Sequence, residues 1–385
     1  MTFNIKTDVK FELYLPASGD FVLGVSKLGV DKLSASAGSW VDIAANLASL
    51  ESRVGPSVQS GIYTQTQPGS IVATFQSETY DPNFNGRVRA GVNIRIQVYQ
   101  NGSWFYLFRG RISDLSVVYN YDGSNVVTLF AYDYLQRFLN ETSGSSFYQP
   151  AGINTGDSIY SLVGSIPSAP VLDYDVGYAH LEYKAGADLN AGDIVNDAIL
   201  AELGLFWYES LDGKLYFRNR NFIANQLTSP AGYSFSDVHS TTASHVCYSD
   251  IRIGVSTDQL ANKVIASYSD GSGTRFSVNR DSYDLYGPQI LEISVPLYTG
   301  GTDLYDWCVA AVNRPVQSTV QQIIFKGVNR TGDLYDATRV AIGDIVQVVK
   351  TIGSNTIDEK FVVINVSHSI NPDVWQTTLE LWKGL

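Results

Sequence analysis

The chain has 385 residues, of which 17% are charged, 44% hydrophobic and 12% aromatic, and its net charge is −12. This balance is typical of an ordered, β-rich protein and excludes a disordered one, and the length suffices for two or more domains with their own cores. The negative charge argues against nucleic-acid binding, which depends on Lys and Arg that neutralise phosphates. The negative charge is compatible with a channel wall that lets DNA pass without binding it.

Cysteines and the N-terminus set further limits. Cys247 and Cys308 are two in number and imply neither a disulfide framework nor a zinc site. The first eight residues lack the apolar run of a secretion signal, and no stretch is long enough for a membrane span. We therefore expect a chain that is made in the host cytoplasm and has no membrane span.

The first elements in chain order are strands. Alternating apolar residues predict a strand from Val9 to Leu15. Between residues 40 and 50 the pattern fits a helix and a strand alike, and we expect a turn near Asp42 followed by a strand. A strand at 71–75 and a turn at 80–83 follow.

A β-meander is predicted between Gly91 and Tyr132. Apolar residues alternate from Ile94 to Val98, and the hairpin dipeptide Asn101-Gly102 follows at once. The chain returns through 104–112, turns again at Asp122-Gly123 and continues through 126–132. This pattern predicts three antiparallel strands.

The meander recurs near the C-terminus. Gly-Asp-Ile-Val-Gln-Val from Gly343 repeats the spacing of Gly-Val-Asn-Ile-Arg-Ile from Gly91, and strand patterns follow at 361–369 and 375–381. The repeat favours two related β-domains over a chance likeness, although β-meanders are common.

The segments between the two meanders complete a fold that is mainly β with α+β insertions. Residues 1–145 are predicted to form a first β-barrel domain, and residues 146–245 an α+β domain with a possible helix from Asp157, a helix at 192–203 and a hairpin at 205–218. Residues 246–280 and 331–385 form a second, discontinuous β-barrel domain. Residues 281–330 form an inserted region with a helix that Thr302 caps and a strand at 320–325.

Several segments, in order along nearly the whole chain, resemble the central tail-hub proteins of tailed bacteriophages, which include baseplate hubs and tail-tip minor tail proteins. They are Trp40-Val-Asp-Ile, Val88-Arg-Ala-Gly-Val-Asn-Ile-Arg-Ile, Leu107-Phe-Arg-Gly-Arg-Ile, Ala131-Tyr-Asp-Tyr-Leu-Gln, Glu202-Leu-Gly-Leu-Phe-Trp-Tyr, Asp212-Gly-Lys-Leu-Tyr-Phe, Asp281-Ser-Tyr-Asp-Leu-Tyr-Gly, Ile342-Gly-Asp-Ile-Val and Trp375-Gln-Thr-Thr-Leu-Glu-Leu. Each consists of turn and core residues, so their order and spacing carry the resemblance.

The resemblance implies a homotrimer whose two β-barrels per subunit build a ring with a central channel. Such a ring joins the hexameric tail tube to the threefold tail tip of the virion and lets DNA pass without specific binding. The implied partners are other tail proteins: the distal tail ring, the tape measure, and tail fibre or tip proteins. The resemblance implies no catalysis in the hub.

Five arginines are the candidate site residues, at the contact between subunits. Alternation places them on the polar face of the first meander, where a solvated sheet face is the plain alternative and Arg pairing with carboxylates of a neighbouring subunit is the functional one. They are Arg87, Arg89, Arg95, Arg109 and Arg111.

Signals for catalysis, cofactors and metals are weak, and we expect none of the three. Gly327 and Gly332 have phosphate-loop spacing, but Asp333 stands where a Lys is required. The histidines, at positions 180, 239, 245 and 368, form no pair at zinc-ligand spacing. Two alternatives stay open: a carbohydrate- or receptor-binding β module, and, as an outsider, a cell-wall glycan hydrolase with Asp173, Asp175 and Glu182 as its acids.

Overall fold

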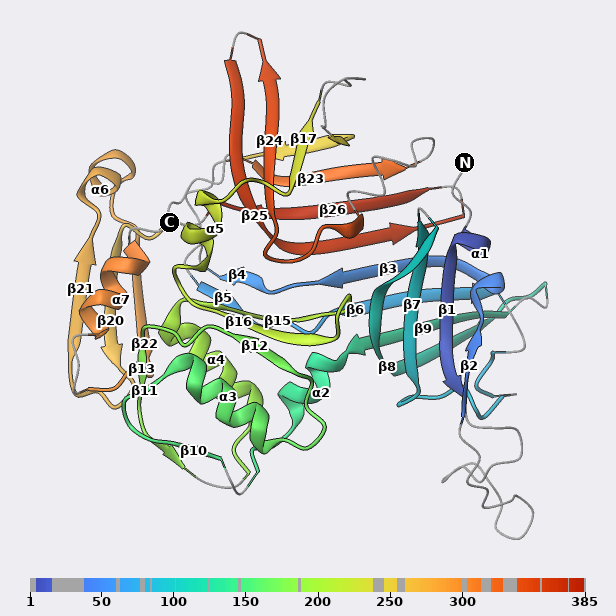
Figure 1. The fold of residues 1–385 in the computed structure, drawn as a ribbon, viewed down its shortest axis with the longest axis horizontal. Helices are drawn as coiled ribbons and strands as arrows, with labels where there is room; N and C mark the ends of the chain where they lie inside the picture. Colours follow the sequence, from blue (N-terminus) through green and yellow to red (C-terminus); the bar gives the residue numbers. More distant parts are fainter. Residues whose placement is uncertain are drawn as a thin grey trace.

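The computed structural model shows a mainly β protein with seven helices among its described residues. It describes residues 5–15, 38–59, 63–76, 80–83, 85–100, 102–122, 125–144, 147–185, 188–237, 246–254, 260–299, 303–312, 320–327, 338–353, 355–372 and 374–383. One large sheet of 14 strands dominates the molecule (Figure 1).

The first meander is confirmed. Its strands are β7 (Asn93–Gln100), β8 (Ser103–Tyr119) and β9 (Asn125–Asp133), each antiparallel to the next. On the far side of β9 follow β6 (Ser70–Gln76) and β3 (Leu47–Val54), and β7 is flanked by β1 (Val9–Leu15) and then β2 (Ser39–Asp42). Short α1 (Ile5–Asp8) precedes β1. Of the two predicted turns, Asn101 and Gly123 lie outside the described residues.

The ambiguous stretch from residue 40 to 50 resolves as a turn and a strand, as predicted. β2 ends at Asp42, a 3-10 turn η1 spans Ala44–Asn46, and β3 begins at Leu47. The Asp42 carboxylate accepts hydrogen bonds from the backbone N–H of Ala44 (3.0 Å) and of Phe11 (3.2 Å). The side chain therefore ties the turn to β1.

The second meander is confirmed as well. It consists of β24 (Ile345–Ile352), β25 (Asn355–Ile370) and β26 (Trp375–Trp382), with β23 (Val320–Gly327) and β19 (Asp250–Ile253) beyond β26. Thus β3, β6, β7, β8 and β9 of the first unit correspond to β19, β23, β24, β25 and β26 of the second, in chain order and in antiparallel pairing. The flanks differ, because β17 (Tyr233–Ser236) pairs parallel with β24 and with β18 (Val246–Cys247).

Matching backbone details show that the two units are structural repeats. The N–H of Gly91 donates to the carbonyl of Ile112, and the N–H of Gly343 donates to the carbonyl of Val363, both at 2.8 Å. Both glycines have left-handed φ values, 88° and 90°, which L side chains disfavour. The register shifts by one residue after Ile112 in β8 and after Val363 in β25. The predicted repeat is therefore present.

The two units form one continuous sheet, because the end of β25 pairs antiparallel with β3. Among the described strands none closes into a barrel of its own. The two units nevertheless have separate hydrophobic cores: one is formed by alternate residues of β1, β3, β6, β7 and β9, the other by β23 to β26 with β17. Ile370 and Trp375, from the second unit, lie in the core of the first.

An α+β region lies against the sheet, on the lower left of Figure 1. Its small sheet contains the hairpin of β15 (Leu205–Glu209) and β16 (Lys214–Arg218), with β12 (Leu172–Tyr174) parallel to β16. Two helices cover this sheet, α3 (Thr155–Ser165) and α4 (Ala191–Glu202). Both predicted helices are present, with Asn154 rather than Asp157 at the N-cap of α3. The chain leaves α4 through Leu203 in the left-handed conformation, not through Gly204. The remaining small elements are β4 (Ser57–Gln59), β5 (Tyr63–Gln65), α2 (Tyr134–Asn140), β10 (Tyr148–Gln149), β11 (Ile153–Asn154), β13 (His180–Leu181), β14 (Lys184–Ala185) and α5 (Phe222–Thr228).

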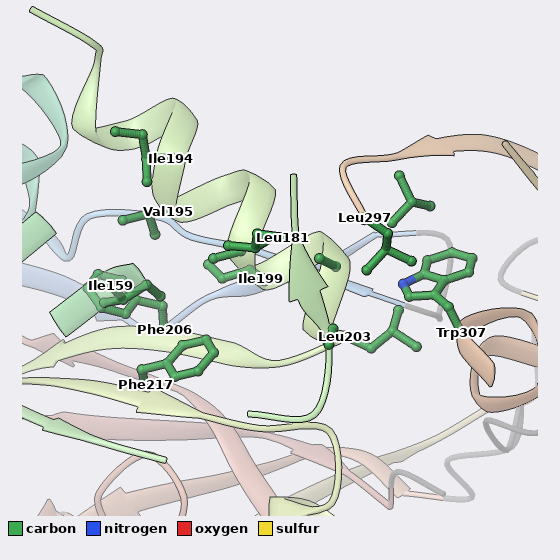
Figure 2. Close-up of a cluster of buried hydrophobic side chains, with 14 of the residues drawn as sticks. Ile159, Leu181, Ile194, Val195, Ile199, Leu203, Phe206, Phe217, Leu297 and Trp307 are labelled. Carbon is green, nitrogen blue, oxygen red and sulfur yellow. The ribbon is translucent and has the colours of Figure 1, made fainter. Parts of the chain in front are cut away.

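A second small sheet packs beside the α+β region. It contains β21 (Thr274–Val278), β20 (Lys263–Tyr268) and β22 (Ile290–Val295), with α6 (Arg280–Tyr286) and α7 (Asp303–Val312). The predicted helix cap Thr302 lies outside the described residues. Figure 2 shows Trp307 of α7 beside Leu203 and Leu297, and its indole N–H donates to the carbonyl of Leu200 at 2.8 Å.

This packing differs from the predicted division of the chain. β20 and β21 were predicted to belong to the second barrel, but they pair with each other in the small sheet, and β20 contributes Val264 and Ala266 to the core of the α+β region. β23 belongs instead to the large sheet. Periodicity locates strands but does not pair them. The domain boundaries themselves stay a prediction.

Candidate functional site

A row of charged residues crosses the polar face of the first meander. Arg95 on β7 lies directly opposite Arg109 on β8, and on its other side Arg95 lies opposite Glu12 of β1, which in turn faces Asp42 of β2. The alternation therefore places Arg95 and Arg109 together, as predicted. Two cations in adjacent strands repel one another unless acids compensate them.

Arg95 takes its compensating acid from its own chain. Its Nε and Nη2 donate to the two carboxylate oxygens of Glu12 at 2.6 and 3.0 Å. The guanidinium also stacks on the Trp40 ring at 4.3 Å. The hydrogen bond to Glu12 raises the pKa of Arg95, and the bidentate geometry is the strong form of this contact. Arg95 is thus a fixed part of the subunit.

The other four arginines have different environments. Arg109 stacks on Tyr106 at 3.6 Å and donates to the carbonyl of Leu211 at 3.1 Å. Arg111 is exposed, and its Nε donates to the Asn93 side-chain oxygen at 2.8 Å. Arg87 and Arg89 lie in the turns before β7 rather than on a strand, so the row does not include them.

These contacts change how an interface role would be tested. Because Arg95 and Arg109 make contacts within the subunit, reversing their charges would disrupt these contacts and destabilise the fold. Arg111 has an exposed guanidinium and a neutral partner, so its charge is available to another molecule. A subunit contact through the five arginines stays a prediction, and Arg111 is its best single test.

Several exposed large apolar side chains along the β8–β9 hairpin were not predicted from the sequence. Val118 and Tyr119 of β8 and Phe130 and Tyr132 of β9 are all exposed large side chains. Periodicity gave no warning, because these residues continue ordinary strand patterns. The available signal was the length of β8, which extends beyond the last residue that pairs with β7.

The three acids considered for a hydrolase have structural partners. Asp173 and Asp175 both face Arg218, at 2.8 and 3.8 Å from its Nη1. Glu182 accepts a hydrogen bond from the hydroxyl of Ser269. Asp173 and Asp175 thus share one cation, and Glu182 is engaged elsewhere. The absence of catalysis stays a prediction.

Two acidic residues within the segments that resemble tail-hub proteins are buried and have structural roles. Asp133 caps α2 by accepting from the N–H of Leu135 at 3.0 Å, and it accepts from Gly69 at 2.8 Å. Burial raises the pKa of Asp133 to about 8. Glu202, at the end of α4, is completely buried and pairs with Arg220. The sequence patterns alone did not distinguish either acid from the other turn and core residues of these segments.

The described residues offer few other sites. Among them no three His, Cys, Asp or Glu side chains converge as a metal site would require. A pocket of about 300 Å³ opens between α2 and the β15–β16 turn, where Arg109 and Tyr134 line it. Of the histidines, His368 is buried and His180 contacts Asp303, while His239, His245 and the Gly332–Asp333 segment lie outside the described part of the chain. No described helix is both long and apolar enough to cross a membrane.

Comparisons with solved structures find whole-length likeness. A tail protein from Neisseria meningitidis MC58 superposes with a TM-score of 0.62 at 13% identity, over 97% of this chain and 96% of that one. The 43 kDa tail protein of prophage MuSo2 from Shewanella oneidensis gives 0.61 at 9% identity, over 98% of each chain. This chain has the fold of phage tail proteins.

The same tail-protein fold recurs in the prophage tail protein gp18 from Listeria monocytogenes EGD-e. That structure gives a TM-score of 0.50 at 9% identity, over 97% of this chain and 94% of that one. No protein-family model matches the sequence, and no curated protein matches it significantly. The resemblance noted in the sequence is therefore confirmed at the level of the tail-protein fold.

Proposed function

We propose that this chain is the structural hub of a bacteriophage tail. Three copies, each with its two repeated β-sheet units, form a ring around a central channel at the tail tip of the virion. The ring joins the hexameric tail tube to the threefold tip, contacts the distal tail ring, the tape measure and fibre or tip proteins, and lets DNA pass. It is assembled from chains made in the host cytoplasm.

The repeat within the chain carries this proposal. The five strands β3, β6, β7, β8 and β9 have counterparts of the same order and pairing in β19, β23, β24, β25 and β26. Three chains therefore present six similar units, which suits a junction between sixfold and threefold parts. The tail-protein fold over nearly the whole chain supports the same role.

The charge of the protein is compatible with a channel for DNA. The net charge of −12 disfavours the retention of a polyanion, whose affinity depends on cations that displace its counterions. The arginines of the first meander do not contradict this, because Arg95 is neutralised by Glu12 within the subunit.

Light scattering together with negative-stain microscopy of the purified protein tests the proposal. We expect the mass of three chains and ring-shaped particles with a central hole. The hub would be contradicted if the purified protein stays monomeric at high concentration and assembled tails show no threefold density. Binding of host glycans by that monomer would favour the carbohydrate- or receptor-binding alternative instead.

A further inference from the structure

The contact between the two units of one chain is a strand addition. β25 is longer than its neighbour β24, and its last five residues, Val366 to Ile370, pair antiparallel with Leu50 to Val54 of β3. Ile370 lies opposite Leu50, and Ser369 lies opposite Glu51. The edge of the second unit is thus completed by a strand of the first.

This addition buries apolar surface and requires a close approach. On β25, Val366, His368 and Ile370 are 7%, 6% and 0% exposed. Gly55 follows β3 with a φ of 126°, and a Cβ there would lie 2.3 Å from the carbonyl of Ile364. The carbonyl of Gly55 accepts a hydrogen bond from the side chain of Asn365 at 3.4 Å. The contact is therefore well packed.

In the first unit, none of the described strands is added to the edge equivalent to the end of β25. The bulges after Ile112 and Val363 align β8 with β25, so that Tyr119 corresponds to Ile370 and Val118 to Ser369. Beyond the contact with β7, residues 113–119 of β8 pair with β9 alone among the described strands. Tyr119 is 53% and Val118 56% exposed, where their counterparts are covered or half-buried.

The strand that would complete this edge is also present, and among the described strands only one of its edges is paired. β19 corresponds to β3, because the same succession of strand pairings leads to each. In the second unit Arg252 lies opposite Gln322, which lies opposite Glu380. In the first unit Glu51 lies opposite Val72, which lies opposite Phe130. Among the described strands β19 pairs only with β23, whereas β3 pairs with both β6 and β25. Its other edge is therefore open.

We infer that β19 of one subunit adds to the end of β8, residues 117–119, in the next subunit. This inference deepens the proposed function and rests on it, since it names the surfaces that join the copies. The strands run antiparallel, with Ile251 opposite Tyr119, Arg252 opposite Val118 and Ile253 opposite Val117. The register is that of the contact between β3 and β25.

A second copy of this chain is the occupant that the observations favour. An open strand edge flanked by exposed apolar side chains promotes uncontrolled association unless something covers it. The donor strand and the acceptor edge lie on the same chain, and their fit is already realised once within it. The contact is heterologous, so repeating it from copy to copy closes a ring or extends a filament.

Disulfide trapping tests the register. The background is Cys247→Ser, and Cys308 is kept because it is fully buried. The test pair is Val118→Cys with Arg252→Cys, and both replace exposed residues of the outer face. Directly opposite residues of an antiparallel pair have Cα atoms about 4.5 to 5.5 Å apart, which lies within the range that a disulfide spans. Mild oxidation is expected to convert most chains into a covalent trimer that reverts to single chains on reduction.

The matched control moves the register by two residues on the same face. Ser116→Cys with Arg252→Cys places the cysteines diagonally, about 7 to 8 Å apart, where a disulfide forms poorly. A trimer by light scattering in which this control cross-links as well as the test pair overturns the strand addition and leaves the hub standing. A protein that is monomeric and does not cross-link overturns both, and a covalent dimer as end product supports the strand addition but overturns the threefold ring.

Hydrogen exchange of the unmodified protein gives an independent result. In the assembled protein, the amides of residues 117–119 and 250–253 are expected to exchange more slowly than in the protein diluted to single chains. Equal exchange of these two segments in both states, with slower exchange elsewhere on assembly, overturns the strand addition.

Discussion

Replacing Glu202 with Gln should destabilise the α+β region severely. One carboxylate oxygen accepts from the hydroxyl of Thr155 and from the N–H groups of Tyr178 and Ala179, all at 2.8 Å. The other accepts from the backbone N–H and Nε of Arg220, both at 3.2 Å. Glu202 is wholly buried, and the side chain of Arg220 is 11% exposed.

The magnitude follows from what Gln cannot do. If the amide oxygen keeps the three donors of Thr155, Tyr178 and Ala179, the amide N–H₂ faces two donors of Arg220. Each unsatisfied buried donor costs about 1 to 3 kcal/mol, and removing one partner of a buried ion pair costs about 3 to 5 kcal/mol. We therefore expect Glu202→Gln to lower the free energy of unfolding by about 3 to 5 kcal/mol.

The measurement is urea unfolding followed by circular dichroism, with Glu141→Gln as the matched control. Glu141 pairs with Arg137 one helical turn away, and both side chains are more than 40% exposed. Such a pair contributes about 0.3 to 0.5 kcal/mol. A loss for Glu202→Gln no larger than that of the control would refute the reasoning. Adding Arg220→Met should recover part of the loss, because the unpaired buried charge is then removed.

Three further predictions concern a close backbone contact, a buried histidine and an exposed arginine. Gly110→Ala should lower the free energy of unfolding by about 1 to 3 kcal/mol, because the added Cβ would lie 2.0 Å from the carbonyl oxygen of Tyr132. Gly164→Ala in α3 meets open space and should raise it by about 0.5 to 1 kcal/mol. Thermal unfolding compares the two variants, and equal effects would contradict the packing. Burial lowers the pKa of His368 to about 3, so the folded protein binds fewer protons than the unfolded chain, and stability is lost as the pH falls below 6.5. Between pH 8 and 5.5 this loss should be about 1.4 kcal/mol, and it should be missing from the pH profile of His368→Asn. If Arg111 lies at a subunit contact, Arg111→Glu should weaken the association of the copies, and raising the salt concentration should weaken the association of the wild-type protein. Sedimentation measures both effects, and unchanged sedimentation at low and high salt would place the Arg111 side chain in solvent.

Local patterns in the sequence determined most elements of the two meanders. Alternating apolar residues located β1, β6, β7 and β24, because a strand with one buried face has a period of two residues. Gly91 and Gly343 marked the equivalent starts of both meanders, since each adopts a left-handed φ that other residues disfavour. The repeat, the mainly β class and the resemblance to tail proteins could therefore be read without a structure.

Pairing between distant segments was decided only by the tertiary structure. Periodicity placed Arg95 and Arg109 on one face, but not Glu12, which reaches Arg95 from a strand 83 residues away in sequence. The joining of β25 to β3, and with it the open edges of β8 and β19, depends on which strands lie side by side. A strand pattern specifies which side chains are buried but not the neighbour that buries them, because every strand edge presents the same backbone donors and acceptors.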